Sequence, residues 1–307
     1  MPVFVRMSAS LKIALAGLLA IACLPVAAQE VVRQDEALDS DRPEAWAMHY
    51  RTASTLMTAF GPSPALAPGD WQAAVELGEI PHLPARKTAV GFNGQKNEDL
   101  NKSPVFGRVR GWIGLPGGFV AELAWTPPVE IEGAKARDLW AAAIARRVVD
   151  ANGVVVSLRA FGQHGAVFGD VTCPAELAGV QDFNLNPYGC QAPSSDTLQL
   201  NYYGLETTAA LMHGPWTWHL SGGVVRMENE VQVDALTYGF RDYSRLTASD
   251  DVGYLAFGVG RSLSKGWGAT AEVLYVPLTV LRTPDGSADS DPMLSFRLQV
   301  RYAFDAE

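Results

Sequence analysis

The chain has 307 residues and carries 33 acidic against 24 basic side chains, a formal net charge of −9. Proteins that bind nucleic acid neutralise its phosphates with clustered lysine and arginine, so this acidic balance excludes nucleic acid as the expected partner. Charge alone does not choose between soluble and membrane-embedded classes, and the pattern along the chain has to separate them.

The first 28 residues have the pattern of an export signal. A positively charged start precedes an apolar run from Ile13 to Leu24, and Val26-Ala27-Ala28 supplies the small residues that signal peptidase prefers. We expect cleavage before Gln29, and the alternative makes Cys23 a lipoprotein cysteine. The run is too short for a membrane-spanning helix, which needs about 20 residues, and no later segment has an uninterrupted apolar run of about 18.

The next segment, residues 29–70, contains a candidate helix at 42–60. Asp41 and Pro43 suit the start of a helix, Trp46, Ala53, Met57 and Phe60 fall at roughly helical spacing, and Gly61 suits its end. The alternative divides 42–60 into two further strands.

From residue 71 onward, apolar and polar residues alternate with the period of two that is typical of strands. The last segment is the clearest, because Leu294 to Phe304 places aromatic and aliphatic residues on one face and polar residues on the other. Ten strands are predicted, at about 71–83, 104–115, 118–127, 137–149, 154–169, 197–212, 216–228, 252–263, 266–281 and 292–304.

The connectors between these strands alternate in length. Tight turns are expected at 115–118, 150–153, 213–215 and 264–266, and longer polar connectors at 84–103, 127–136, 170–196, 229–251 and 282–291. Transmembrane barrels have short periplasmic turns and long outer loops, whereas a soluble sandwich has no reason to alternate in this way. The sequence therefore predicts an all-β, antiparallel up-and-down transmembrane barrel of about ten strands, or twelve if 42–60 forms two.

In these features the chain resembles bacterial outer-membrane β-barrel proteins as a class. Barrels of that class commonly end on phenylalanine, and this chain departs from them because Asp305-Ala306-Glu307 follow Phe304. The resemblance implies a Gram-negative outer membrane as location and its lipid as partner. The expected organisation is a signal peptide at 1–28, an N-terminal segment at 29–70 that plugs or underlies the lumen, a barrel at 71–304 and a tail at 305–307.

Charged residues on the polar strand faces are expected to point into the lumen. They are Arg108, Arg110, Glu122, Arg159, Glu206, Glu272, Arg297 and Arg301. We expect the last hairpin to set Glu272 opposite Arg301, and the turn at 116–117 to bring Arg110 near Glu122. Such pairs either fill the lumen or form a constriction that selects small ions or solutes.

Three other groups of residues are candidate sites. Cys173 and Cys190 are the two cysteines that remain after export, and an even count in an oxidising compartment predicts one disulfide. Neither these cysteines nor the acidic loop 285–291 has the spacing of a metal site, so no metal and no cofactor are expected.

His219-x-Ser221 is similar to the His-x-Ser motif of outer-membrane phospholipases and lipid A deacylases, in which the pair faces lipid. Here Trp218 and Leu220 take the lipid face, so His219 and Ser221 should point into the lumen. We therefore expect no catalytic residue, with a lipid hydrolase using His219 and Ser221 as the alternative.

The leading functional hypothesis is a narrow transport channel, or a barrel that handles lipid or a small solute. A binding or structural barrel that acts through its outer loops is the second hypothesis, and the lipid hydrolase is the third. The sequence sets neither the ligand nor the oligomeric state.

Overall fold

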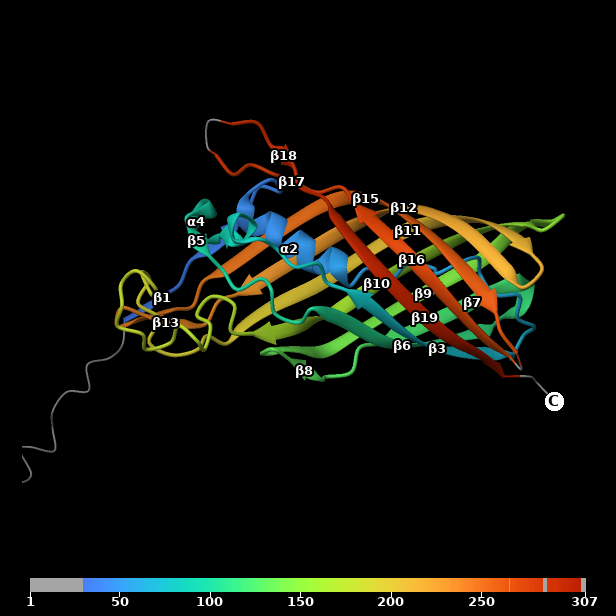
Figure 1. The fold of residues 1–307 in the computed structure, drawn as a ribbon, viewed down its shortest axis with the longest axis horizontal. Coiled ribbons are helices and arrows are strands. Elements are labelled where there is room, and N and C mark those ends of the chain that lie inside the picture. The colour runs from blue at the N-terminus through green and yellow to red at the C-terminus, as the bar shows by residue number, and fades with distance from the viewer. Residues whose placement is uncertain (1–29, 265, 284–285, 305–307) are drawn as a thin grey trace, which may run out of the picture.

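A computed structural model of the chain describes residues 30–264, 266–283 and 286–304, and its main feature is a closed β-barrel (Figure 1). The barrel strands are β3 Trp71–Glu79, β6 Val105–Gly114, β7 Phe119–Trp125, β9 Ala134–Ala151, β10 Val154–Gly169, β11 Asp196–His213, β12 Trp216–Gln232, β15 Arg245–Ser262, β16 Trp267–Val276 and β19 Met293–Phe304. Each pairs with its neighbour in the chain, and β19 closes the barrel on β3. The prediction of ten strands is confirmed and the twelve-strand alternative is wrong.

Shorter elements surround one end of this barrel. They are β1 Glu30–Val32, β2 Asp35–Ala37, α2 Pro43–Ser54, α3 Ala85–Thr88, β4 Ala89–Val90, α4 Gly91–Gly94, β5 Lys96–Asn97, β8 Glu130–Ile131, β13 Ala235–Thr237, β14 Phe240–Asp242, β17 Thr279–Val280 and β18 Asp289–Ser290. A 3₁₀ turn, η1 Pro116–Gly118, joins β6 to β7 at the other end. The predicted signal peptide and the tail 305–307 lie outside the described residues.

The two ends of the barrel differ as the connector lengths predict. The tight turns gather at the end where β3 begins and β19 finishes, which we call the turn end (Figure 1). The long connectors gather at the opposite end, which we call the loop end. All four tight turns contain residues with positive φ, for example Gly117 at 78° and Asn152 at 54°, as tight hairpins require.

The barrel wall is uneven in height. Strands β9 to β12 and β15 have 16 to 18 residues, whereas β3, β6, β7, β16 and β19 have 7 to 12. The connector predicted at 229–251 is shorter than expected, because β12 continues to Gln232 and β15 begins at Arg245. Toward the loop end, the outward residues of β12 and β15 are polar, so the apolar alternation stops there. The backbone ladder between the two strands nevertheless continues to the pair of Gln232 and Arg245.

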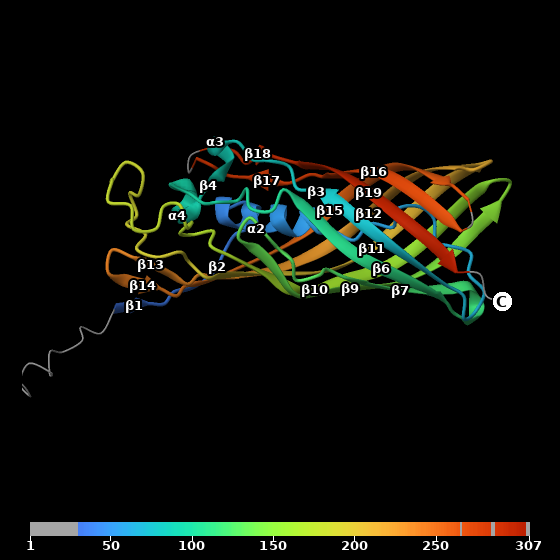
Figure 2. The ribbon, with the colours of Figure 1, turned by 60° about the horizontal axis from the view of Figure 1, so that its bottom comes forward.

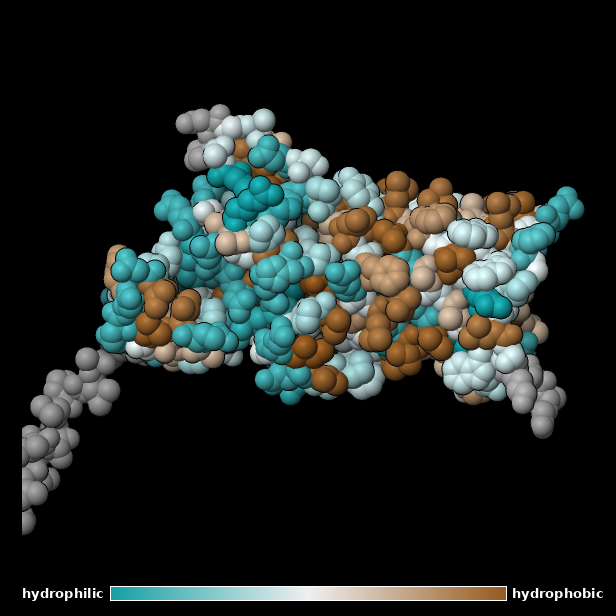
Figure 3. Space-filling view, viewed as in Figure 1, coloured by the Kyte–Doolittle hydropathy of each residue, from teal (hydrophilic) through white to brown (hydrophobic). Residues whose placement is uncertain are grey.

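Exposed apolar side chains occur on all ten barrel strands, and on the face seen in Figure 3 they form a belt over the half nearer the turn end. Leu205 is 68% exposed, Leu77 55% and Phe257 53%, whereas the residues between them on the same strands point inward. Trp125 and Trp140 stack on this surface at 5.8 Å. Exposed apolar area of this extent needs a hydrocarbon environment, and aromatic residues suit its boundary.

The N-terminal part of the described chain passes through the barrel from one end to the other. β1 pairs with β14 and β2 with β15 at the loop end, α2 lies inside the barrel, and the following residues run toward the turn end, where β3 begins (Figure 2). Trp46, Leu56 and Met57 are completely buried. We call residues 43–64 the plug. No helix among the described residues is both long and apolar enough to span a membrane.

The predicted disulfide joins Cys173 and Cys190 in the loop-end connector between β10 and β11. Both residues are buried against Val233 and Ala235. Closing a loop with a sequence separation of 17 stabilises by about 3 kcal/mol in the chain-entropy model.

Replacing both cysteines with serine is therefore expected to loosen this connector and leave the barrel closed. Limited proteolysis should cut residues 170–195 faster in the double variant than in the oxidised protein, while heat-dependent gel migration stays unchanged. Equal cleavage rates would show that the connector is ordered without the disulfide.

Candidate functional site

Four arginines of the barrel wall bind the chain at the end of α2. Their guanidinium groups donate to six consecutive backbone carbonyls, those of residues 53–58. Arg297 donates to Ala53, Ser54 and Leu56, Arg108 to Thr55, Arg159 to Met57 at 2.7 Å, and Arg110 to Thr58 at 2.9 Å. The last carbonyls of a helix lack internal partners and carry partial negative charge, so cations are favourable there.

We call these arginine-to-carbonyl hydrogen bonds the arginine clamp. The clamp explains why α2 is shorter than the helix predicted from the sequence. The sequence favours a helix as far as Phe60, but α2 ends at Ser54. The carbonyls beyond it are directed to the wall, and the amide of Met57 donates to the hydroxyl of Tyr202 at 2.8 Å. Tertiary hydrogen bonds thus override the local helical pattern.

Four buried glutamates balance the four arginines. Glu76 lies 2.8 Å from Arg110, and Glu122 lies 3.1 Å from Arg110 and 3.0 Å from Arg159. Glu206 lies 3.1 Å from Arg159 and accepts from the amide of Ala59 at 3.0 Å. We call the eight residues the charge belt: Arg108, Arg110, Arg159, Arg297, Glu76, Glu122, Glu206 and Glu272. All are at most 6% exposed, so the belt and the plug fill the lumen at this level.

The structure places seven of the predicted lumen charges in this belt and corrects one predicted pair. Glu272 pairs in register with Arg297, and Arg301 pairs with Gly268, so Glu272 does not face Arg301. The hairpin of β16 and β19 is centred two residues earlier than the sequence prediction placed it. The β17–β18 pair, in which Thr279 lies opposite Ser290, continues the same register. Arg110 does meet Glu122, although Ala124 is its partner in register.

His219 and Ser221 both point into the lumen, as predicted, but they bind different partners. Nε2 of His219 lies 3.1 Å from Glu272, whereas the hydroxyl of Ser221 bonds to Thr208 at 2.8 Å. Among the described residues the pair is not arranged as a nucleophile with its base.

The sequence reasoning missed Glu76, which lies in β3 between the exposed residues Val75 and Leu77. The alternation of β3 with exposed apolar residues on either side of Glu76 predicts that its side chain points into the lumen.

The acidic loop 285–291 lies partly outside the described residues, and its Asp291 binds Arg282 at 2.8 Å and Lys87. No cluster that could hold a metal occurs in the described part of the chain.

Above the charge belt, toward the loop end, the lumen contains a cavity of about 810 Å³, which we call the outer cavity. Among the barrel strands, α2 packs mainly against β11, β12, β15 and β19, and this leaves space on the side of β6, β9 and β10. The floor is a buried apolar cluster of Ile80, Phe106, Leu139 and Leu200. Val167, Phe168 and Leu198 extend the apolar lining.

The barrel wall is interrupted beside this cavity. β6 pairs with β7 only from Val109 to Gly114, so residues 105–108 have a ladder partner on the β3 side alone. The facing chain is Thr126-Pro127-Pro128-Val129, and proline has no backbone N–H to donate to a ladder. The cavity lining includes Phe106, from the inner face of the wall, and Val105, from its outer face. The outer cavity thus reaches the outer surface through this break.

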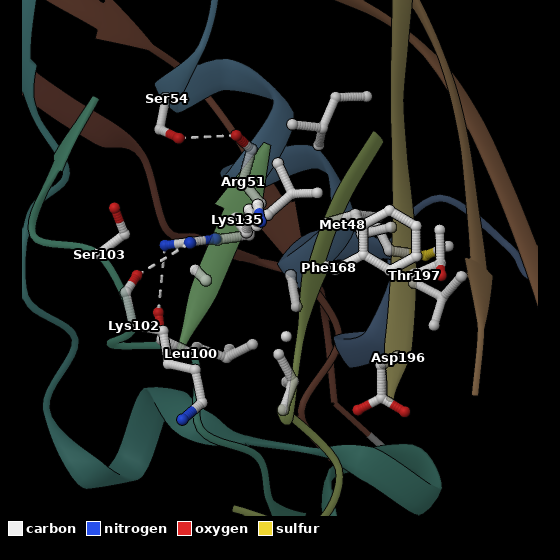
Figure 4. Close-up of a pocket in the computed structure, with 18 of the residues that line it drawn as sticks. Met48, Arg51, Ser54, Leu100, Lys102, Ser103, Lys135, Phe168, Asp196 and Thr197 are labelled. Carbon is white, nitrogen blue, oxygen red and sulfur yellow. Dashed lines mark hydrogen bonds between the residues drawn. The ribbon is translucent and has the colours of Figure 1, made fainter. Parts of the chain in front are cut away.

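A few polar groups lie at the rim of the outer cavity. The guanidinium of Arg51 donates to the backbone at Leu100 and Lys102 (Figure 4), at 2.9 Å for the latter. Lys102 is held by Asp99 at 2.9 Å and Asp170 at 2.8 Å. Most of the surface is apolar, with few oriented polar groups, which is the usual composition of a small-molecule site.

No protein-family model and no curated protein sequence matches the chain. Solved structures share its general architecture. The outer-membrane protease OmpT of Escherichia coli is 8% identical, with a TM-score of 0.39 over 79% of this chain and 99% of that one. The translocator domain of autotransporter NalP of Neisseria meningitidis is 12% identical, with a TM-score of 0.35 over 87% and 100%. Ail of Yersinia pestis is 8% identical, with a TM-score of 0.27 over 78% of this chain and 100% of that one.

The closed antiparallel barrel, its apolar belt and its polar lumen define the class. The chain has the fold of the bacterial outer-membrane β-barrel proteins. At these identities the similarity concerns the fold, and activity has to be argued from the site itself.

Proposed function

We propose that this barrel takes up an apolar or amphipathic molecule, of the size of a lipid chain, into the outer cavity. The observation that carries the proposal is the apolar cavity that meets the outer surface at the break between β6 and Pro127-Pro128. A ligand with a hydrocarbon chain would bury apolar area there at about 25 cal/mol per Å². The break gives such a ligand a route from the membrane that does not cross water.

The closed lumen argues against a general aqueous pore. The charge belt and the plug occupy the level between the outer cavity and the turn end, and their charges are paired. In our proposal the turn end faces the periplasm and the loop end faces outward, since short turns are periplasmic in such barrels. Outer-membrane lipid is then both the surroundings of the protein and the source of its ligand.

Two measurements on the same preparation test this function. The reconstituted protein should bind a fluorescent long-chain acyl probe saturably, and it should give no steady ohmic current in planar bilayers. A steady current without saturable probe binding would replace our proposal with the channel hypothesis.

The pH dependence of binding supplies a further prediction through Glu98, which lies in the connector between β3 and β6 and lines the outer cavity. Burial raises the pKa of Glu98 to about 8, although Lys96 lies 2.6 Å away and favours the charged form. The carboxyl group is therefore mainly neutral below pH 8 and ionises above it, which places charge in an apolar cavity.

Binding of an uncharged long-chain probe is accordingly expected to weaken as the pH rises through about 8. The variant Glu98→Gln should bind with little dependence on pH over the same range, because its amide does not ionise. An identical pH profile in the two proteins would show that Glu98 does not control the cavity.

A further inference from the structure

A second cavity, of about 350 Å³, lies at the turn end of the lumen, and we call it the inner cavity. It is bounded by the part of the plug nearer the turn end and by β3, β9, β11, β12, β15, β16 and β19. Its described lining includes Arg147, Arg301 and His219 but no aspartate or glutamate. Asp150 lies outside this lining and pairs with Arg147, so Arg301 is the arginine of the described lining without a carboxylate partner.

Arg301 is directed by the glycine across from it. Gly268 is its partner in register on β16, and a Cβ atom at Gly268 would lie 2.8 Å from Nε of Arg301. The side chain of Arg301 therefore packs over the backbone of Gly268, in space that a Cβ atom would occupy. Among the described residues, Arg301 makes no ion pair and no side-chain hydrogen bond. Its donors are therefore available to an anion in the inner cavity, and bonds from guanidinium to an oxyanion are stronger than those between neutral groups.

Two other polar side chains near Arg301 have a nitrogen without a partner. Nε2 of Gln299 and Nδ1 of His219 are buried without a hydrogen-bond partner in the described part of the chain. His219 lines the inner cavity, and Gln299 lines a small adjoining space together with Arg301. Arg147 reaches the cavity from β9, but its donors are already used by the carbonyl of Ser63 and by Asp150, both at 2.6 Å.

We propose that the inner cavity binds a phosphate-type oxyanion, with Arg301 as its principal ligand. The planar guanidinium suits two oxygens of such an anion, and the side-chain amide of Gln299 supplies a further donor. The same chemistry is offered by free phosphate and by the headgroup of an anionic phospholipid. The site is separate from the outer cavity and does not depend on the function proposed for it.

Calorimetric titration of the detergent-solubilised protein with inorganic phosphate is the first arm of the test. The second arm compares capture by vesicles with and without phosphatidylglycerol. Binding is expected in at least one arm, and Arg301→Gln should weaken it by at least about tenfold. The arm that responds identifies the source of the anion.

Arg261→Gln is the matched control, because Arg261 lies near the same end but on the outer surface, over Trp216. Heat-dependent gel migration checks that each variant is folded. Gly268→Ala should also weaken binding, since its methyl group would displace Arg301. The proposal is overturned if neither arm shows binding or if Arg301→Gln binds as the parent does. It is also overturned if binding appears only when residues 305–307 are removed, because these residues would then occupy the cavity.

Discussion

Replacing Arg159 with leucine is expected to destabilise the barrel by about 3–5 kcal/mol, because it leaves two buried acidic groups without their shared cation. Arg159 lies 3.0 Å from Glu122 and 3.1 Å from Glu206, and it also donates to the plug at Met57. Equilibrium unfolding in detergent micelles, followed by tryptophan fluorescence, measures the change.

Arg226→Leu is the control for this prediction. Arg226 pairs with Asp251 on the outer surface, where the two side chains are 37% and 66% exposed, so its loss should cost about 0–1 kcal/mol. Equal losses in the two variants would mean that the charge belt does not stabilise the fold.

The second large effect is expected from Ala136→Trp, which places an indole in the outer cavity. Ala136 lines the cavity and packs against the apolar cluster around Leu139. Binding of a long-chain probe should fall by at least about tenfold, while the barrel remains folded.

Ala269→Trp controls for the added indole, since Ala269 lies on the outer face of β16, two residues from Trp267. Its probe affinity should equal that of the parent protein. Unchanged binding by Ala136→Trp would place the probe outside the outer cavity.

The sequence predicted all ten strands because a strand with one face toward lipid and one toward the lumen must alternate. The same rule made the inward residues predictable even where the pairing was wrong. The error in the last hairpin was two residues in its centre, which changes partners but keeps every side chain on its face. Arg297 and Arg301 therefore point inward as expected, while Glu272 has a different opposite residue.

The remaining features depend on contacts between distant parts of the chain. The arginine clamp needs wall residues as far apart as Arg108 and Arg297 to converge on the plug, and no local pattern encodes this convergence. The break beside the outer cavity left a visible trace, because Pro127-Pro128 cannot donate to a strand ladder. Whether this break opens into the outer cavity depends on the residues of β6 that lie opposite it. Those residues come into place only in the assembled barrel.

A crystal structure grown with a brominated long-chain fatty acid tests the central claim most directly, because the anomalous signal of bromine locates the chain. Our account predicts bromine inside the barrel, between α2 and the cluster of Phe106, Leu139 and Leu200. Bromine found only on the outer apolar belt, with the outer cavity empty of it, would contradict the account.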